Sequence, residues 1–218
     1  MEPYFVGDRV RPQGQASLEL YVVPDPGADT DLTALLDRAT AVLQRFPAVA
    51  VTLPHMTIQP ITHRPAAQIS DLERAELISA LGETISNTPA FDVLVGPAFA
   101  STVGVLMDVY PEAPVESLIL DLRKAITQVA PRAAVDYDAR PAHMTVGYAR
   151  QHADSGVITS ALRRGVRPSH ARLRVHTLTL VEVWQDLDLC QYIWRTLRTF
   201  PLGAPGSTTA VGICAGTP

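Results

Sequence analysis

The sequence predicts a mixed α and β fold in which two halves repeat one rhythm of strands and helices. Three observations support this prediction. Of the 218 residues, 47% are hydrophobic. The spacing of apolar residues changes several times between the period of a strand and that of a helix, and the tripeptide His-Met-Thr occurs once in each half. Because a chain of this length and apolar content can bury a sizeable core, we expect a single globular unit.

The first half is expected to form strand, helix, strand and helix. Two segments rich in β-branched residues predict the strands, at residues 17–24 and 49–61. Two segments with apolar residues at helical spacing predict the helices, at residues 31–46 and 70–85. Asp31 is the expected cap of the first helix, and Ser70 with Glu73 forms the pattern of a capping box at the second.

The second half repeats this rhythm with additional strands. Extended segments are predicted at residues 91–109, 133–146 and 173–184, and helices at residues 116–129 and 155–164. Gly96, Pro97 and Gly104 supply turn signals inside the first extended segment, and Pro131 ends the first helix. Residues 191–200 close the fold as a strand or a short helix, since periodicity does not decide between them.

We divide the chain into a lead-in over residues 1–16, one folded domain over residues 17–202 and a flexible C-terminal tail over residues 203–218. The tail is rich in small residues and has no periodicity that could bury a face. Cys190 and Cys214 are too few for a disulfide scaffold, which favours a reducing compartment.

Charge and hydropathy narrow the classes of function. A net charge of −4 and a pI near 5.8 argue against the broad basic surface of proteins that coat long nucleic acids. The N-terminus lacks the features of a signal peptide, and no stretch approaches the roughly eighteen apolar residues that span a bilayer. We therefore expect a cytoplasmic protein without membrane contact. We predict no protein partner, and so a monomer.

The two copies of His-Met-Thr are the most informative feature of the sequence. Both closely follow a proline and precede a β-branched residue, so both are expected on extended backbone. Side chains two positions apart on a strand share one face. His55 therefore lies beside Thr57 and His143 beside Thr145, while the methionines between them are expected to point into the core.

Each pair of imidazole and hydroxyl is suited to phosphate chemistry. An imidazole exchanges a proton near neutral pH, and a hydroxyl about 6 to 7 Å along the strand can hold a phosphoryl oxygen. If the halves are related by a pseudo-twofold arrangement, one histidine reaches the attacking oxygen and the other the leaving oxygen at one phosphorus. We predict that His55 and His143 are catalytic, that Thr57 and Thr145 bind phosphate, and that no metal or other cofactor is needed.

The segments PHMTIQP and AHMTVGYAR resemble the paired His-x-Thr/Ser motifs of the 2H phosphoesterase superfamily, in particular its 2'-5' RNA ligase-like and cyclic phosphodiesterase members. The resemblance extends over nearly the whole chain before the tail, because the order of elements and the late LTLVEVW segment also fit. It implies a bilobal α+β fold, with two antiparallel sheets lining a central cleft and helices outside. It also implies metal-independent opening of 2',3'-cyclic phosphates, or reversible formation of 2'-5' linkages, by the four residues already named.

Four further residues are candidates for substrate binding. Tyr148 and Arg150 follow the second motif and could stack on a base or hold a second phosphate oxygen. Tyr21 and Trp184 could line a nucleobase pocket, although aromatic residues on strands more often belong to the core. The other histidines lack a hydroxyl partner on their own face or lie in polar loops, and we expect them to be noncatalytic: His63, His152, His170 and His176.

Several functions remain open at this point. The leading one is hydrolysis of a 2',3'-cyclic phosphate on an RNA end or a small nucleotide. The alternatives are 2'-5' RNA ligation, against which the acidic balance argues because two RNA ends need a basic groove, and a module that binds a phosphate or RNA end without turnover. A zinc site near His143, with Asp136 and Asp138, is a further alternative, but no close ligand cluster supports it.

Overall fold

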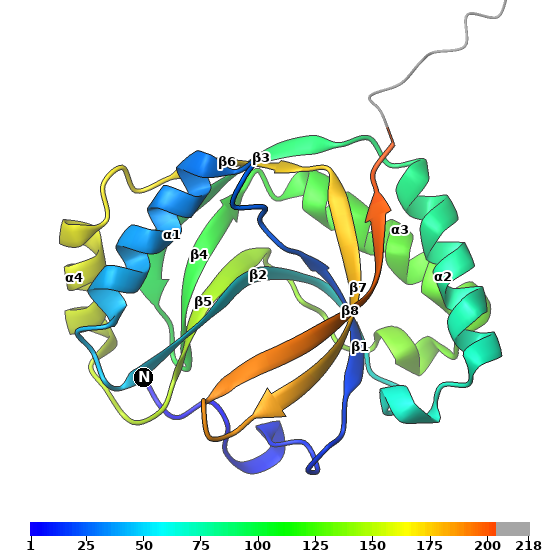
Figure 1. Cartoon of the computed structure of the whole chain (residues 1–218), viewed down its shortest axis with the longest axis horizontal. Helices are drawn as coiled ribbons and strands as arrows, with labels where there is room; N and C mark the ends of the chain where they lie inside the picture. Colours follow the sequence, from blue (N-terminus) through cyan, green and yellow to red (C-terminus); the bar gives the residue numbers. More distant parts are fainter. Residues whose placement is uncertain (204–218) are drawn as a thin grey trace, which may run out of the picture.

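The computed structural model describes residues 1–203, which form one eight-stranded antiparallel sheet and four α-helices (Figure 1). The strands are β1 (Ser17–Val22), β2 (Val49–Ile61), β3 (Phe91–Ala100), β4 (Gly104–Tyr110), β5 (His143–Ala149), β6 (Ala171–Val175), β7 (Thr177–Asp186) and β8 (Gln191–Pro201). The helices are α1 (Thr30–Leu43), α2 (Asp71–Ser86), α3 (Ala113–Val129) and α4 (Ser155–Gly165), and three short 3-10 turns are η1 (Gly7–Arg9), η2 (Ala66–Gln68) and η3 (Arg132–Val135).

The strand order places the two His-Met-Thr segments in the middle of the sheet. The order is β6-β3-β4-β5-β2-β1-β7-β8, so that β5 and β2 are the central pair. We expected two sheets, but the structure has one continuous sheet, whose two four-stranded halves join at this pair. In Figure 1, α1 and α4 lie outside one half and α2 and α3 outside the other. The predicted α+β class, with helices outside a bilobal antiparallel framework, is confirmed.

The two sheet halves are not the two halves of the sequence. Strands β3, β4, β5 and β6 form one of them from a continuous stretch of chain. The other combines β1 and β2 with β7 and β8, which come from opposite ends of the described chain. The predicted strand at residues 173–184 is therefore two strands, because the backbone crosses at His176 from the edge of one half to the other half.

The core lies between the sheet and the helices and follows the predicted periodicity. Met56 and Met144 are both 0% exposed, which confirms that the two motif methionines point into the core. In α1 the buried residues repeat at helical spacing: Leu32, Leu35, Leu36, Ala39, Val42 and Leu43. These core side chains cover one face of β2 and β5. The other face of the two strands therefore lines the concave side of the sheet.

Helix capping agrees with the sequence in one case and differs in the other. The capping box of α2 is confirmed, since Ser70 Oγ accepts the Glu73 N–H and the Glu73 carboxylate accepts the Ser70 N–H. The cap of α1 is Asp29 and not Asp31. The Asp29 carboxylate caps no N–H of the helix and instead accepts the N–H of Asp25, in the preceding turn, at 2.9 Å.

The segment at residues 133–146, predicted as extended, also differs. It begins with η3, in which the Ala134 N–H donates to the Pro131 carbonyl at 2.8 Å, and only from His143 does it form β5. The final segment is a strand, β8, and not a helix.

Two parts of the chain outside the predicted domain contact it. The lead-in packs on the end of β5, where the Tyr4 N–H donates to the Ala149 carbonyl at 2.9 Å. Gly203, which we assigned to the tail, forms a β-bridge with Pro89. Residues 204–218, the rest of the predicted tail with Cys214, lie outside the described residues. None of the described helices has the length and hydropathy needed to span a bilayer.

Candidate active site

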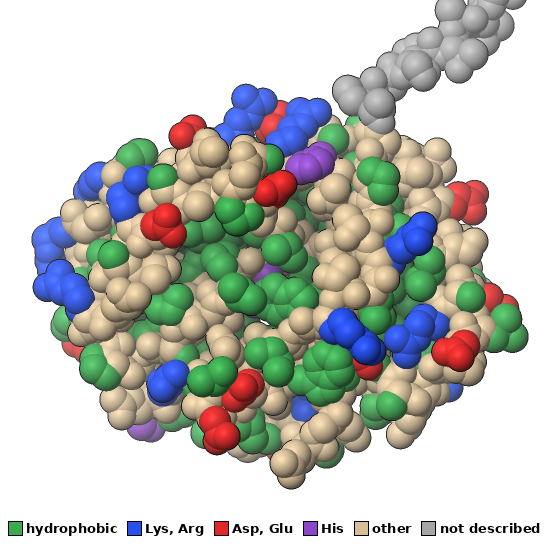
Figure 2. Space-filling view, viewed as in Figure 1, with side chains coloured by type: hydrophobic (Ala, Val, Ile, Leu, Met, Phe, Trp, Pro, Cys, Tyr) green, Lys and Arg blue, Asp and Glu red, His purple; other side chains and the backbone are tan. Residues whose placement is uncertain are grey.

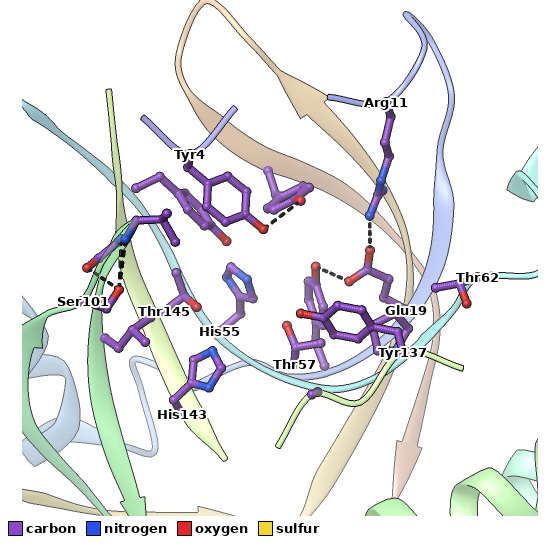
Figure 3. Close-up of a pocket in the computed structure, with 18 residues that line it drawn as sticks. Tyr4, Arg11, Glu19, His55, Thr57, Thr62, Ser101, Tyr137, His143 and Thr145 are labelled. Atoms are coloured by element: carbon purple, nitrogen blue, oxygen red, sulfur yellow. Dashed lines mark hydrogen bonds and ion pairs between the residues drawn. The ribbon is translucent and has the colours of Figure 1, made fainter. Parts of the chain in front are cut away.

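A cavity of about 340 Å³ opens on the concave face of the sheet. Figure 2 shows this face hollowed in its middle and lined mainly by hydrophobic side chains, with a histidine at the floor of the hollow. The four residues predicted to act on phosphate all line the cavity, and Figure 3 shows them grouped at its floor: His55, Thr57, His143 and Thr145. The fold thus brings the two motifs to one site.

Strand pairing interleaves the two motifs. In the antiparallel pair of β2 and β5, His55 lies opposite Thr145. Continuing this register by two residues sets Thr57 opposite His143. Each histidine therefore has two threonines nearby, one two positions along its own strand and one across the strand pair.

A β-bulge follows each motif at an equivalent place. The pairing of β2 with β1 passes over Ile58, and the pairing of β5 with β4 passes over Val146. Such a bulge shifts the alternation of side chains by one residue. As a result Pro60 in one half and Tyr148 in the other face the cavity. The matched bulges support the predicted pseudo-twofold relation between the halves.

Backbone carbonyls orient both imidazoles in the same way. Nδ1 of His55 lies 2.8 Å from the carbonyl oxygen of Leu53, and Nδ1 of His143 lies 2.9 Å from that of Pro141. A carbonyl oxygen only accepts hydrogen bonds, so we assign the proton to Nδ1 in both rings. In the neutral ring the lone pair is then on Nε2, which leaves this atom free for proton transfer.

The two histidines differ in burial. His55 is 1% exposed. Its ring stacks on Tyr21, with centroids 4.6 Å apart and planes 23° from parallel, and meets the edge of Trp194 at 5.2 Å. Burial lowers the pKa of His55 below the ordinary value of 6.5, and the Leu53 carbonyl and Glu19 only partly oppose this effect. His55 is therefore neutral at pH 7, while His143 is half-buried.

A buried carboxylate holds the wall behind His55. Glu19 is 5% exposed and accepts three hydrogen bonds: from Arg11 at 2.9 Å, from Ser17 at 2.6 Å and from the Tyr21 hydroxyl at 3.0 Å. Burial, followed by the nearby Glu19 charge, raises the pKa of Tyr21, so its hydroxyl stays protonated and donates to Glu19. This network fixes the ring on which His55 stacks.

Aromatic residues from the lead-in, β5 and β8 close the cavity on one side. We call Tyr4, Phe5, Tyr148 and Tyr192 the aromatic cluster. Its ring centroids lie 4.7 Å apart for Tyr4 and Tyr148, 5.3 Å for Phe5 and Tyr192, and 5.5 Å for Tyr148 and Tyr192. Because these rings pack on one another edge to face or tilted, the cluster is a preformed wall.

Tyr137 is a different kind of aromatic residue. It lines the cavity but is 56% exposed, and its ring lies outside the aromatic cluster. Its carbonyl accepts hydrogen bonds from Arg123 at 3.0 Å and from the buried Gln59 side chain at 3.2 Å, which anchor this part of the loop before β5. In Figure 3 the Tyr137 ring projects toward the middle of the cavity, so it offers a free face to a ligand.

The structure brings two of the four further candidates to the cavity and leaves two outside it. Tyr21 and Tyr148 line the cavity. Arg150 follows the end of β5 and donates to the Leu189 carbonyl at 2.9 Å, away from the histidines. Val183 packs with Tyr21 on one face of β7. Trp184 lies on the opposite face of this strand and packs against the main core. The expectation for Arg150 and Trp184 is corrected accordingly.

Several residues of the cavity were not predicted from the sequence. They are Tyr4, Arg11, Glu19, Tyr137 and Tyr192, with Trp194 behind His55. Only Glu19 could have been found, since it shares a strand face with Tyr21 in SLELY. The other four histidines do not line the cavity. Among residues 1–203, no three His, Cys, Asp or Glu side chains come close enough to hold a metal ion.

Solved structures share this architecture. TT0787 of Thermus thermophilus matches with a TM-score of 0.66 at 13% identity, over 87% of this chain and 100% of that one. E. coli LigT complexed with 3'-AMP matches with a TM-score of 0.56 at 15% identity, over 86% and 98% of the two chains. The chain has the 2H phosphoesterase fold. The MHV ns2 PDE domain shares the 2H phosphoesterase fold as well, with a TM-score of 0.52 at 12% identity, over 78% of this chain and 100% of that domain.

No family model and no curated protein matches the sequence. The fold class expected from the resemblance of the two motifs is confirmed. In this 2H phosphoesterase fold the two motif strands form the centre of the sheet.

Proposed function

We propose that this chain is a metal-independent phosphodiesterase that opens 2',3'-cyclic phosphates by acid–base catalysis with two histidines. The observation that carries the proposal is the convergence of His55 and His143 on one cavity, each ring oriented through Nδ1 with Nε2 free. E. coli LigT, which shares the fold, is complexed with 3'-AMP and with phosphate in two of its structures. These ligands support a nucleotide with a phosphate on its ribose as the kind of molecule bound here.

In the proposed reaction His55 is the base and His143 the acid. The neutral His55 accepts a proton at Nε2 from the water whose oxygen attacks phosphorus, and protonated His143 gives its Nε2 proton to the ribose oxygen that leaves. One P–O bond forms and one breaks, so the cyclic diester becomes a monoester. The hydroxyls of Thr57 and Thr145 donate to the phosphoryl oxygens that take no part in bond exchange. Tyr137 offers a ring on which the base can stack.

Turnover by this route should fall as the pH drops below 6.5. Because the pKa of His55 is lowered, the ring is still neutral at pH 6.5, and the loss is centred below that value. A profile of kcat/KM against pH, from about pH 4.5 to 8, measures this. A rate that keeps rising as the pH falls through this range would assign His55 the role of acid instead.

The burial of His55 also makes the stability of the fold depend on pH, so the pH profile of turnover needs a control for unfolding. Unfolded His55 would bind a proton at its ordinary pKa and the folded protein only below it, so the free energy of unfolding declines as the pH falls below 6.5. Circular dichroism at each pH separates this loss of fold from loss of chemistry.

The test of the proposed function is turnover in the presence of EDTA. Purified protein is incubated with nucleoside 2',3'-cyclic phosphates and with a short RNA that ends in a cyclic phosphate. The expected product is a monoester, formed equally with and without chelator. No turnover of any substrate would reject the proposal, and activity that EDTA abolishes would favour a metal mechanism. Binding without turnover would favour a binding module. The cytoplasmic location and the monomeric state stay predictions.

A further inference from the structure

The charged groups that line the cavity nearly cancel. Within the described chain, the lining contains one arginine, one glutamate and the two histidines, and neither lysine nor aspartate. Its remaining polar side chains are the hydroxyls of threonine, serine and tyrosine. His55 is neutral at pH 7 because burial lowers its pKa. In its proposed role as the acid, His143 supplies the one positive charge of the lining that no carboxylate pairs.

Both terminal nitrogens of Arg11 donate to neighbouring groups. One terminal nitrogen donates to Glu19 at 2.9 Å, and the other donates to Ser17 at 2.5 Å and to the Val183 carbonyl at 3.3 Å. The guanidinium also lies over the Tyr192 ring, 5.4 Å from its centroid. Since Glu19 is buried, releasing Arg11 toward a ligand would leave this carboxylate without its ion-pair partner. Arg11 therefore supports the wall, and its charge is already paired with that of Glu19.

We propose that the cavity selects a substrate with a single phosphate, a nucleoside 2',3'-cyclic monophosphate, and disfavours one that carries a second phosphate group. This inference rests on the proposed function. A cyclic diester carries one negative charge, which one imidazolium can match. A terminal monoester adds a charge of about −1.5 to −2 at pH 7, and an anion taken from water without a partner is costly.

The size of the cavity agrees with a single nucleotide. At about 340 Å³ it is at the lower end of small-molecule sites, which span roughly 300–1,000 Å³. The fold alone does not impose this limit, because E. coli LigT is complexed with ATP in one structure and with NADP+ in another. The selection against a second phosphate comes from the side chains of this chain.

The test compares three ligands by calorimetry: a nucleoside 3'-monophosphate, the 3',5'-bisphosphate, and the 3'-monophosphate with a 5'-O-acetyl group. The acetyl group adds bulk at the same position without charge. We expect the bisphosphate to bind at least about tenfold more weakly than the monophosphate, because its second phosphate loses hydration without gaining a charged partner. The acetyl derivative should bind within about threefold. Equal or tighter binding of the bisphosphate, or an equal loss with the acetyl group, would overturn the proposal.

A matched pair of variants tests whether charge is the cause. Thr62 lines the cavity, is exposed and has no part in the proposed chemistry. Thr62→Lys should narrow the difference between bisphosphate and monophosphate by about threefold or more, and the uncharged Thr62→Met should leave it unchanged. An unchanged difference in Thr62→Lys would contradict the proposal.

Turnover separates this inference from the proposed function. Weaker binding of the bisphosphate without turnover of any cyclic phosphate would support the selection by charge and contradict the proposed enzymatic activity. Turnover of all three corresponding cyclic phosphates with equal kcat/KM would support the proposed enzymatic activity and contradict the selection by charge.

Discussion

Replacing His143 with alanine should lower kcat/KM for a nucleoside 2',3'-cyclic phosphate by about 10²- to 10⁴-fold, because the leaving oxygen loses its proton donor. His55→Ala should have an effect of similar size, since the attacking water loses its base. In the double variant the loss should be much smaller than the product of the two single losses, because groups that act as a unit are not additive. Steady-state kinetics of the three variants measure this.

His176 provides the matched control. It lies in an exposed position between β6 and β7 and does not line the cavity, so His176→Ala should keep the activity of the original chain. His143 is the cleaner of the two catalytic positions, because it is half-buried while His55 is packed between Tyr21 and Trp194. Unchanged turnover in folded His143→Ala would refute the mechanism. Lost turnover with retained binding of a 3'-nucleotide would exclude a pure binding module.

Replacing Thr145 with valine should lower kcat/KM by about 10- to 100-fold. Valine keeps the shape of this buried side chain but lacks the hydroxyl that we expect to donate to a charged phosphoryl oxygen, a bond of about 1.5–3 kcal/mol. Thr57→Val should show a loss in the same range. Thr145→Ser keeps the hydroxyl and should retain most of the activity, as measured by the same kinetics.

Thr62→Val controls for the loss of any hydroxyl from the cavity. Thr62 lines the cavity away from the two motifs, and its hydroxyl donates to the Ala133 carbonyl at 3.3 Å. This variant should change kcat/KM by less than about threefold. If Thr145→Val were as active as the original chain, or if Thr145→Ser were as impaired as Thr145→Val, the phosphate-binding role would be wrong.

The sequence was sufficient for the parts of the site that depend on strand periodicity. Alternation along a strand places His55 and Thr57 on one face, and the observed β2 has the bounds predicted for residues 49–61. The burial of the motif methionines follows from the same alternation. These features are local, so the order of residue types is enough to predict them.

The remaining features depend on contacts between distant parts of the chain. The bulge at Val146 turns Tyr148 toward the cavity. Gly147 in HMTVGYA is the residue type that signals a bulge or a close approach of another backbone, but it does not distinguish the two. Arg11 belongs to the predicted lead-in and is held at the site by Glu19 and Ser17 of β1 and by the Val183 carbonyl of β7. Trp184 and Trp194 could not be told apart as neighbours of His55 without knowing how β7 pairs with β8.

The order in which the strands are made has a consequence for how the protein matures. The half of the sheet that carries His55 needs β7 and β8, so a nascent chain that ends before residue 191 lacks both Tyr192 and Trp194. During synthesis the continuous lobe of β3 to β6 can assemble first, while β1 still has one unpaired edge. The ribosome must therefore release almost the whole domain before the pocket around His55 can close, and truncated products should be inactive.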